Sequence, residues 1–432
     1  MNGKRCVLAY SGGLDTSVIV LWLREKGYEV HAVLVDVGQD ENLQALCLKA
    51  KRLGAASAIV RDAKPAMLES VVPKAIGLAA TYEGNYRLGT AIARPFIAAE
   101  QVRRAKELGG ATLAHGATGK GNDQVRFEFA YRSLAPGYPV LAPWKVWDLE
   151  GRRDLVEYLR SRGYNENFEV TKELSMDENL WHLSVEGGSL EDPTACVDIG
   201  RVLSAVSDRF ATGPVGLDAP FSVEVSFTRG VPTGLNGESA ALGELLGELN
   251  RAYRHAPWAW DLVIENRFTG IKSRGVYINP AAKLLHLAVD ALARCCLNKP
   301  TYDQYVELGR QYGAMLYRGE YFSDQRLVLD AAAGAIMSRL NGTVTVQLSP
   351  VPYAAKIDAS RTIFSKSLST FEASSYSHAD AKGFINLSWL ASVGRPFTEE
   401  GHADLVEAKD AAASDVCPAE SVPGAGLVSA AV

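Results

Sequence analysis

The sequence predicts an α/β fold in which helices cover both faces of a parallel sheet. Three observations carry this prediction in the N-terminal third of the chain. Short apolar runs alternate with longer segments of helical length, the longer segments stop at glycines, and polar glycine-rich loops follow the apolar runs. Because parallel strands need crossover connections, which are usually helices, this alternation favours a parallel sheet over a series of hairpins.

Each element follows from its own stretch of residues. The apolar runs have the length of buried strands, and the segments between them are long enough for helices. The expected strands are residues 6–10, 29–38, 56–62 and 111–115, and the expected helices are residues 16–28, 42–54 and 92–108. Ligands of such sheets bind at the carboxyl ends of the strands. The polar loops that follow these strands should therefore line one edge of the sheet.

Length, charge and cysteine content narrow the class of protein. A chain of 432 residues with 47% hydrophobic residues can form two domains and a tail. A net charge of −5 provides no basic field for long contacts with nucleic acid, so we expect small-molecule ligands and no nucleic-acid partner. The six cysteines include no CxxC pair, which favours reduced thiols over a zinc site or disulfides. No apolar run approaches the roughly 20 residues needed to cross a bilayer, so we expect a cytoplasmic protein without a membrane partner.

The first polar loop, SGGLDTS at residues 11–17, has the composition of a phosphate-binding turn. Gly12 and Gly13 permit positive φ and close backbone approach, the following helix offers free N–H groups, and the hydroxyls add donors. The spacing is neither that of a Walker A loop nor GxGxxG. A tight turn with a capped helix is the alternative. Asp15 would repel phosphate unless a cation offsets its charge, so we take it as a pointer to Mg²⁺.

The second polar loop, HGATGKGNDQVRFE at residues 115–128, is denser in polar groups than a surface loop requires. An amino-acid ligand needs an acidic partner for its ammonium and a cationic or hydroxyl partner for its carboxylate. Asp123 could supply the first, and Thr118, Lys120 and Asn122 could supply the second. The alternative is a glycine-rich turn that caps a helix starting near Asp123.

The stretches AYSGGLDTS and GATGKGNDQVRF resemble the two signature stretches of the argininosuccinate synthase family. The likeness extends through residues 86–95, 141–164, 175–193 and 263–277. It implies a HUP-like ATP-pyrophosphatase domain with a parallel sheet, then a second α/β synthetase domain and a C-terminal oligomerisation segment. The implied boundaries are residues 1–165 for the nucleotide-binding domain, 166–355 for the synthetase domain, 356–408 for the oligomerisation segment and 409–432 for a disordered tail.

The resemblance also implies a reaction, in which a ligase forms a C–N bond for arginine biosynthesis. In the family, the ureido oxygen of citrulline attacks the α-phosphate of ATP, and pyrophosphate leaves. The amine of aspartate then displaces AMP from the citrullyl-AMP intermediate to give argininosuccinate. The implied cofactors are ATP and Mg²⁺, and the implied assembly is a homotetramer.

The family's site residues carry over by motif. For ATP the implied residues are Ala9, Tyr10, Ser11, Gly12, Gly13, Leu14, Asp15, Thr16, Ser17, Val35, His115 and Gly116. For aspartate they are Thr118, Asn122 and Asp123. For the ureido substrate they are Tyr86, Ala91, Arg126, Ser175, Ser184, Glu265 and Tyr277, with Arg94 assigned to a carboxylate or the phosphates. The implied catalytic residues are Asp15, Lys120 and Asp123, with Asp15 as the magnesium ligand and Asp123 as the nominated general base.

Two stretches depart from the family pattern and keep other functions open. Where the family usually reads VYETPGG, residues 276–282 read VYINPAA, and residues 258–262 place Leu262 where we expect an acid. Val35 and Ala91 also differ from the residues usual there. One interpretation is sequence drift, in which neighbouring side chains repack around the changed residues and the function stays the same. The alternatives are the same chemistry on another ureido or carbonyl acceptor in a specialised pathway, or a nucleotide-binding paralog without turnover.

The rest of the chain supports fewer expectations. We expect a helix near residues 281–297, a strand at 342–348, and a loop at 175–184 that presents Ser175 and Ser184. Trp181 should serve as packing, and His182 and His286 as structural histidines rather than ligands. The apolar face of residues 383–394 should dock on a neighbouring subunit.

Overall fold

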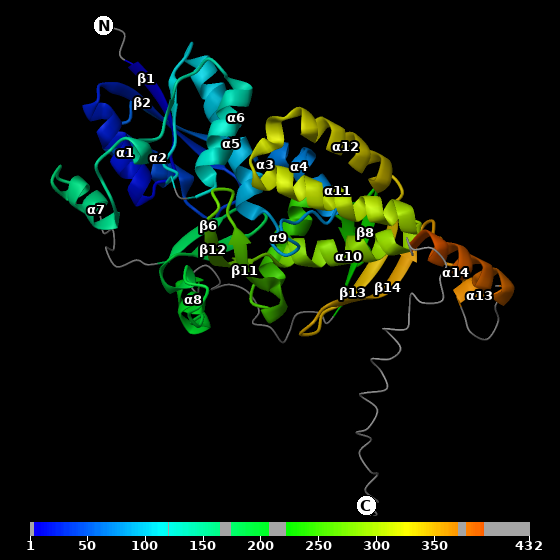
Figure 1. The fold of residues 1–432 in the computed structure, drawn as a ribbon. Coiled ribbons are helices and arrows are strands. Elements are labelled where there is room, and N and C mark those ends of the chain that lie inside the picture. The colour runs from blue at the N-terminus through cyan, green and yellow to red at the C-terminus, as the bar shows by residue number, and fades with distance from the viewer. Residues whose placement is uncertain (1–3, 120, 165–173, 207–221, 370–376, 393–432) are drawn as a thin grey trace, which may run out of the picture. The chain divides into compact units, whose positions relative to one another are not determined.

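The structure is a computed structural model that describes residues 4–119, 121–164, 174–206, 222–369 and 377–392 (Figure 1). The chain divides into two compact units, residues 1–364 and residues 365–432. The division into four parts that the sequence suggested stays a prediction. The disordered tail at 409–432 and the side chain of Lys120 lie outside the described residues.

The N-terminal sheet is parallel and has the strand order β3-β2-β1-β4-β5. Its strands are β1 (Lys4–Ala9), β2 (Tyr28–Asp36), β3 (Ser57–Asp62), β4 (Thr112–Ala114) and β5 (Val140–Leu141). The helices of this region are α1 (Leu14–Glu25), α2 (Leu43–Arg52), α3 (Lys64–Glu69), α4 (Val71–Gly77), α5 (Gly89–Glu107), α6 (Asp123–Leu134) and α7 (Arg152–Arg160). The parallel sheet and the alternation of strands and helices confirm the sequence-based prediction.

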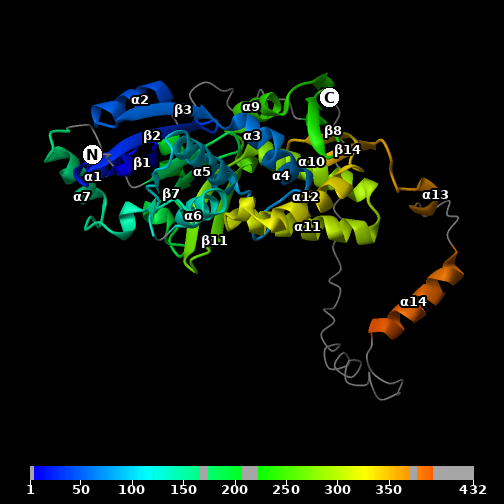
Figure 2. The same cartoon turned by 90° about the horizontal axis from the view of Figure 1, so that it is seen from above.

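Alternation along the strands explains why helices cover both faces of this sheet. In β1, Val7 belongs to the hydrophobic cluster that includes α5, whereas Cys6 and Leu8 belong to the cluster that includes α1 and α2. Successive side chains of a strand point to opposite faces, so both faces of this apolar run must be buried. Helices α5 and α6 lie side by side on one of these faces (Figures 1 and 2).

A second sheet is antiparallel, with the order β11-β12-β7-β6. Its strands are β6 (Ser175–Glu178), β7 (Leu183–Glu186), β11 (Trp260–Asn266) and β12 (Lys272–Ile278). The expectation of a loop at 175–184 is therefore wrong, because β6 and β7 form a hairpin in which Asp177 pairs with Ser184. Trp181 lies in the turn of this hairpin and is fully buried, as expected for a packing residue.

The third sheet is also antiparallel, with the order β10-β9-β8-β13-β14. Its strands are β8 (Ser222–Thr228), β9 (Val231–Leu235), β10 (Glu238–Ser239), β13 (Gly342–Gln347) and β14 (Tyr353–Ala359). The helices that follow β7 in the first unit are α8 (Ile199–Val206), α9 (Leu242–Tyr253), α10 (Pro280–Cys296), α11 (Lys299–Tyr317) and α12 (Asp324–Met337). The predicted helix near 281–297 and strand at 342–348 are confirmed as α10 and β13.

Helix α11 packs closely on the chain that follows α4. Gly309 and Gly313 lie one turn apart on α11, and a Cβ atom at these positions would overlap the carbonyl oxygens of Leu78 and Thr81. Tyr317, at the end of the same helix, stacks on Tyr82 with ring centroids 3.6 Å apart. The two glycines therefore allow a helix from late in the chain to approach the N-terminal region at backbone distance.

The second unit contains α13 (Lys366–Ser369) and α14 (His378–Ser392). Several large apolar side chains of α14 are exposed, namely Phe384, Ile385, Leu387, Trp389 and Leu390. The idea that this helix docks on a neighbouring subunit stays a prediction.

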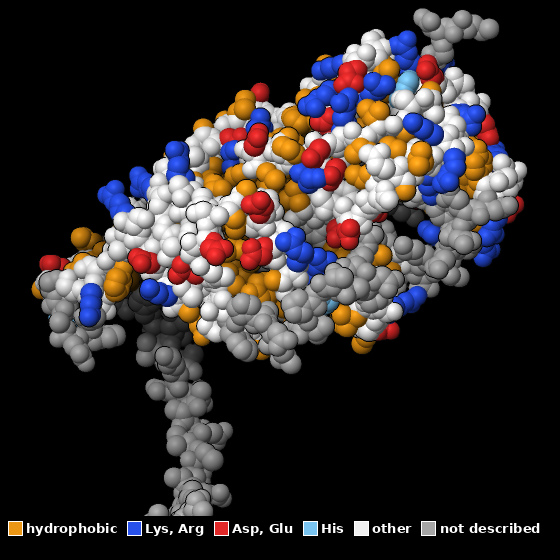
Figure 3. Space-filling model, turned by 180° about the vertical axis from the view of Figure 1, so that it is seen from behind, with side chains coloured by type: hydrophobic (Ala, Val, Ile, Leu, Met, Phe, Trp, Pro, Cys, Tyr) orange, Lys and Arg blue, Asp and Glu red, His pale blue; other side chains and the backbone are white. Residues whose placement is uncertain are grey.

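The surface carries charges of both signs. Figure 3 shows acidic and basic side chains interspersed over one face, with apolar patches between them. No helix among the described residues is long and apolar enough to cross a membrane.

Candidate active site

The loop between β1 and α1 forms an open, hydroxyl-rich turn. Gly12 adopts φ of +76°, and Gly13 caps α1 in an extended conformation without a side-chain hydrogen bond. The Ser17 hydroxyl donates to the Gly13 carbonyl at 2.8 Å, and the Ser11 and Thr16 hydroxyls lie 3.3 Å apart. The first amides of a helix have no intrahelical partner, so these N–H groups and hydroxyls can meet an anion.

The second polar loop meets the first at the sheet edge. A Cβ atom on Gly116 would lie 3.2 Å from Thr16 Cγ2 and 3.9 Å from Asp15 Cβ, so the backbone of this loop touches the start of α1. Val35 is buried near the end of the neighbouring strand β2. The structure therefore brings the loops that follow β1 and β4 together at one edge of the sheet, as expected from the sequence.

His115 lies beneath the second loop rather than in the open site. Its side chain is fully buried, its ring stacks on Phe127 at 5.3 Å, and its Nδ1 accepts the Ala117 amide at 3.2 Å. The other ring nitrogen, Nε2, lies 3.5 Å from Glu128 Oε1. His115 thus fixes the backbone of the loop.

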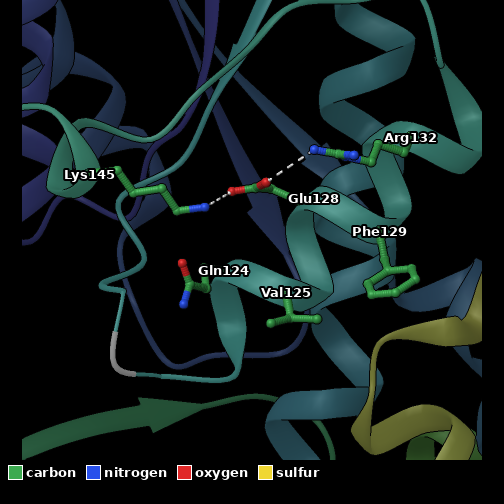
Figure 4. Close-up of a pocket in the computed structure, with 6 residues that line it drawn as sticks. All are labelled: Gln124, Val125, Glu128, Phe129, Arg132 and Lys145. Carbon is green, nitrogen blue, oxygen red and sulfur yellow. Dashed lines mark hydrogen bonds and ion pairs between the residues drawn. The ribbon is translucent and has the colours of Figure 1, made fainter. Parts of the chain in front are cut away.

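A surface hollow of about 390 Å³ lies on the outer face of α6 (Figure 4). It is lined by Gln124, Val125, Glu128, Phe129, Arg132 and Lys145. Glu128 forms an ion pair with Lys145, and its second oxygen lies 4.0 Å from Arg132. The His115 side chain, followed by Lys145, lowers the pKa of Glu128 to about 2 despite partial burial. Glu128 therefore connects this outer face of α6 to the second loop.

Asp15 is the acidic residue in the first turn of α1. Burial raises the pKa of its carboxyl, and hydrogen bonding to the backbone and the charge of Arg152 only partly oppose this. Among the described residues, no three His, Cys, Asp or Glu side chains form a metal-binding group. Mg²⁺ is commonly held by one or two carboxylates together with substrate phosphates, so a single carboxylate beside a phosphate loop fits this ion.

A chain of alternating charges connects α5, α6 and β6. Arg94 Nε donates to Asp123 Oδ2 at 2.8 Å, and another guanidinium nitrogen of Arg94 pairs with Asp177. Arg126 donates to the other oxygen of Asp123 at 2.9 Å. Burial alone would raise the pKa of Asp123, but the two guanidinium groups lower it below its ordinary value. Asp123 is therefore held as a carboxylate between two cations.

Asn122 and Tyr317 extend this arrangement toward β11 and β12. Asn122 Nδ2 donates to the Tyr317 hydroxyl at 2.8 Å, and that hydroxyl donates to Glu265 Oε2 at 2.6 Å. The Tyr277 hydroxyl donates to Glu265 Oε1 at 3.2 Å. Tyr86 packs edge-on against Tyr277 with ring centroids 4.9 Å apart. Four of the implied site residues thus meet in one buried network.

One face of the second sheet carries polar side chains. Ser175 pairs with Glu186 and Asp177 with Ser184, while Ser184 also pairs with Tyr277 across β7 and β12. Directly opposed residues share a face, so these side chains project from the same side, as do Glu265 and Ser273. Ser184 is 2% exposed, whereas Ser175 is exposed. The opposite face carries Leu183, Val185, Val276 and Ile278, which pack in an apolar cluster.

Two protein-family models match this chain, one over the region of the parallel sheet and one over the region that follows it. A family model described as arginosuccinate synthase N-terminal HUP domain matches residues 5–165, and one described as arginosuccinate synthase C-terminal domain matches residues 174–393. The chain belongs to the argininosuccinate synthase family. The matches confirm the predicted fold class, a HUP domain with a parallel sheet followed by a synthetase domain.

Individual argininosuccinate synthases match nearly the whole chain. Those of Caldicellulosiruptor saccharolyticus and Caldanaerobacter subterraneus are each 39% identical to it, over 394 and 416 residues. The alignments cover 90% and 94% of this chain and 96% and 99% of the two relatives. A solved structure of a predicted tRNA methyltransferase subunit from Methanocaldococcus jannaschii matches 48% of this chain and 88% of that one, at 13% identity and a TM-score of 0.25.

The stretches that depart from the argininosuccinate synthase pattern lie mostly away from the polar face. Ile278 packs in the apolar cluster on the opposite face, and Leu262 is half exposed on the same side as Trp260. Ala281 and Ala282 are buried in α10. Asp261, however, pairs with both Arg87 and Lys283. Asp261 thus supplies an acid one position before Leu262, where the family pattern has an acid.

The remaining implied residues of the family site are less closely assembled. Thr118 is exposed beside residue 120, and Ala91 is buried inside α5.

His182 and His286 are buried, and burial lowers the pKa of each, to about 4 for His182 and about 3 for His286. Neutral, packed histidines agree with the structural role expected for them.

The sequence analysis did not identify Asp177, Glu186 or Tyr317 as residues of the site. For Glu186 the available signal was alternation, because in LSVE every second residue is polar, which is typical of a strand with one polar face. In SMDE the signal was weaker, because Met176 separates Ser175 from Asp177 but Glu178 is polar as well. Tyr317 carried no local signal, because its partner Asn122 lies 195 residues earlier.

Proposed function

We propose that this chain ligates L-aspartate to L-citrulline with ATP, giving argininosuccinate, AMP and pyrophosphate through a citrullyl-AMP intermediate. Membership of the argininosuccinate synthase family at 39% identity over most of the chain supports the reaction. The structural observation that carries it is the position of Asp123. This carboxylate, held by Arg94 and Arg126, starts the helix that follows the Gly116 loop, and that loop touches the start of α1.

The loop at residues 11–17 would hold the phosphates of ATP. Its hydroxyls and the amides at the start of α1 suit the negative charge that builds on pyrophosphate as it leaves the α-phosphate. Asp15 would hold Mg²⁺, with the phosphates as further ligands, and the ion would supply additional charge neutralisation there. Val35 and the Gly116 backbone would complete the nucleotide site.

Asp123, Asn122 and Thr118 would hold aspartate. The lowered pKa of Asp123 makes it a good partner for the ammonium of aspartate and a poor proton acceptor, so we propose binding rather than general-base catalysis for it. Lys120 stays a proposed catalytic residue on the strength of its place in the family motif.

The ureido substrate would lie on the polar face of the second sheet, near Tyr86, Arg126, Ser184, Glu265 and Tyr277. Such a site acts mainly by positioning, because the ureido oxygen itself is the nucleophile and no covalent intermediate with the protein is needed. The oxygen must reach the α-phosphate in line with the departing pyrophosphate.

Release of AMP and pyrophosphate tests the proposal directly. With ATP, aspartate and citrulline, both products should form in equal amounts, together with argininosuccinate. Release with another ureido or carbonyl acid but not with citrulline would favour the same chemistry in a specialised pathway. Nucleotide binding without release for any acceptor would favour a non-catalytic paralog.

A homotetramer and a cytoplasmic location stay predictions. A tetramer would give the exposed apolar residues of α14 a partner surface. Light scattering of the purified full-length chain measures the assembly, and a monomer at working concentration would overturn this part of the proposal.

A further inference from the structure

Helix α2 contacts the back of the first polar loop at two points. Leu46 packs on Gly12, since a Cβ atom on this glycine would lie 2.4 Å from Leu46 Cδ2. About one turn later, Lys49 Nζ donates a hydrogen bond to the Gly12 carbonyl at 3.0 Å. Residues three apart share one face of a helix, so α2 presents an apolar and a cationic side chain to the same glycine. No residue of α2 was expected in the site.

The hydrogen bond from Lys49 acts on the peptide unit between Gly12 and Gly13. A trans peptide is planar, and its C=O and N–H groups point in opposite directions. Because Lys49 holds the Gly12 carbonyl toward α2, the Gly13 N–H points away from α2. This N–H has only a long contact with the Ser11 hydroxyl oxygen, at 3.4 Å, which is beyond the usual range of such bonds. The Gly13 amide is therefore oriented and available for an anion.

The peptide unit that follows Gly13 is fixed by α1 itself. The Gly13 carbonyl accepts the Ser17 amide at 3.0 Å and the Ser17 hydroxyl at 2.8 Å. Gly12 on the other side has φ of +76°, and a glycine can leave such a conformation more easily than other residues can. Lys49 thus supplies on the Gly12 side the restraint that α1 supplies on the Ser17 side.

A role in helix stability alone does not explain this contact. The last turn of α2 carries Lys49, Lys51 and Arg52, and a cation there interacts favourably with the helix dipole from any of these positions. Lys51 and Arg52 are exposed, whereas Lys49 is partly buried with its ammonium on the Gly12 carbonyl. Its position therefore indicates a function that the two neighbouring cations do not share.

We propose that Lys49 is a positioning residue of the nucleotide site, which directs the Gly13 amide toward the pyrophosphate portion of ATP. The inference rests on the proposed function, because that function makes the loop at residues 11–17 the place where pyrophosphate leaves. The ammonium also brings positive charge to the back of the loop, and it polarises the peptide group that it binds. Both effects strengthen as negative charge collects on the leaving pyrophosphate.

Steady-state kinetics and product inhibition test this role. Lys49→Met keeps a long unbranched side chain and removes the ammonium. We expect KM for ATP to rise about tenfold, because a hydrogen bond from a charged group is lost, and KM for aspartate and citrulline to stay within about twofold. Inhibition by pyrophosphate should weaken by a similar factor. Inhibition by AMP, which lacks the β- and γ-phosphates, should stay unchanged, whereas a general structural defect would weaken the binding of both products.

Lys51→Met is the matched control. It removes an exposed cation from the same last turn of α2, so both variants change the net charge and the helix dipole alike. Lys49→Arg keeps the charge and the donor, and should recover part of the affinity for ATP and pyrophosphate. A surface hollow of about 520 Å³ that is lined by Leu46, Lys49 and Tyr164, among others, leaves room for the larger group.

The outcomes separate this inference from the proposed function. Equal KM for ATP and equal inhibition by pyrophosphate in Lys49→Met and Lys51→Met would overturn the positioning role and leave the proposed function standing. If the unmodified chain binds ATP but releases no pyrophosphate with any acceptor, the proposed function is overturned. A larger Kd for pyrophosphate in Lys49→Met than in Lys51→Met, measured by calorimetry, would then still support the role of Lys49. Binding of neither ATP nor pyrophosphate by the unmodified chain would overturn both.

Discussion

Arg94 on α5 donates from Nε to Oδ2 of Asp123, the first residue of α6, over 2.8 Å. The same guanidinium pairs with Asp177 on β6, so one side chain connects the nucleotide-binding region with the polar sheet. The sequence suggested that Arg94 would meet a substrate carboxylate or the phosphates. That role stays a prediction. In the structure the charge of Arg94 is shared by two carboxylates of the protein, and we predict that it positions Asp123.

Arg94→Gln should disable the aspartate site. Without Arg94, Asp123 and Asp177 lose the cation between them, and removing one member of such a partly buried network costs about 3 kcal/mol. We expect KM for aspartate to rise by more than tenfold and the melting temperature to fall. Lys106→Gln, an exposed charge removal on the same helix, is the control. An Arg94→Gln variant with normal KM for aspartate would contradict the positioning role.

Asp15→Asn should impair the use of ATP far more than folding. Because burial raises the pKa of this carboxyl in the folded chain, replacing it with a neutral amide should not reduce stability. The concentration of Mg²⁺ needed for half-maximal pyrophosphate release should increase, while the thermal unfolding midpoint stays the same or rises. An unchanged Mg²⁺ dependence would show that Asp15 is not a ligand of the ion.

Gly12→Ala and Gly27→Ala form a matched pair. Both glycines have positive φ, +76° and +80°, so either alanine introduces backbone strain of about 1 kcal/mol. A Cβ atom at Gly27 meets no atom within 4 Å, whereas at Gly12 it would overlap Leu46 of α2. We expect both variants to lose some stability but only Gly12→Ala to lose affinity for ATP, measured by nucleotide titration. Equal affinity for ATP in both variants would argue against a phosphate loop at Gly12.

Glu128→Gln should reveal an ion pair that stabilises the second loop. The pKa of Glu128 is lowered in the fold to about 2, below its ordinary value, so the stabilisation is present above about pH 4.5 and is lost as pH falls toward 2. Because the Lys145 side chain is largely exposed, we expect a loss of at most about 1 kcal/mol in the free energy of unfolding at pH 7. The difference from the unmodified chain should shrink in acid. Urea unfolding at several pH values measures it, with the exposed Glu157→Gln as control. A loss that does not depend on pH would instead indicate a packing effect.

The sequence predicted the site best where the pattern and the residues it indicates lie in the same short segment of the chain. The glycine and hydroxyl pattern at 11–17 predicted the turn between β1 and α1, and the polar run at 115–128 predicted the loop that precedes α6. Both follow from local rules for strands, turns and helix starts. The alternation of strands and helices predicted the parallel sheet for the same reason.

Contacts between distant segments could not be predicted in this way. The pairing of Arg94 with Asp177 and of Asn122 with Tyr317 depends on how separate elements pack, which no window of residues contains. We expected a loop at residues 175–184, yet this segment contains the paired strands β6 and β7. The alternation of apolar and polar residues in β7 was the signal for a strand there.

The glycines of α11 have a consequence for how the protein is made. Because Gly309 and Gly313 place this helix directly against the backbone at Leu78 and Thr81, the N-terminal region needs residues more than 200 positions later to cover it. During synthesis, its parallel sheet emerges long before α11 exists. A ribosome-bound or truncated chain that ends near residue 165 should therefore expose apolar surface and depend on chaperones, and the nucleotide site should reach its final stability only when Tyr317 has closed over Tyr82.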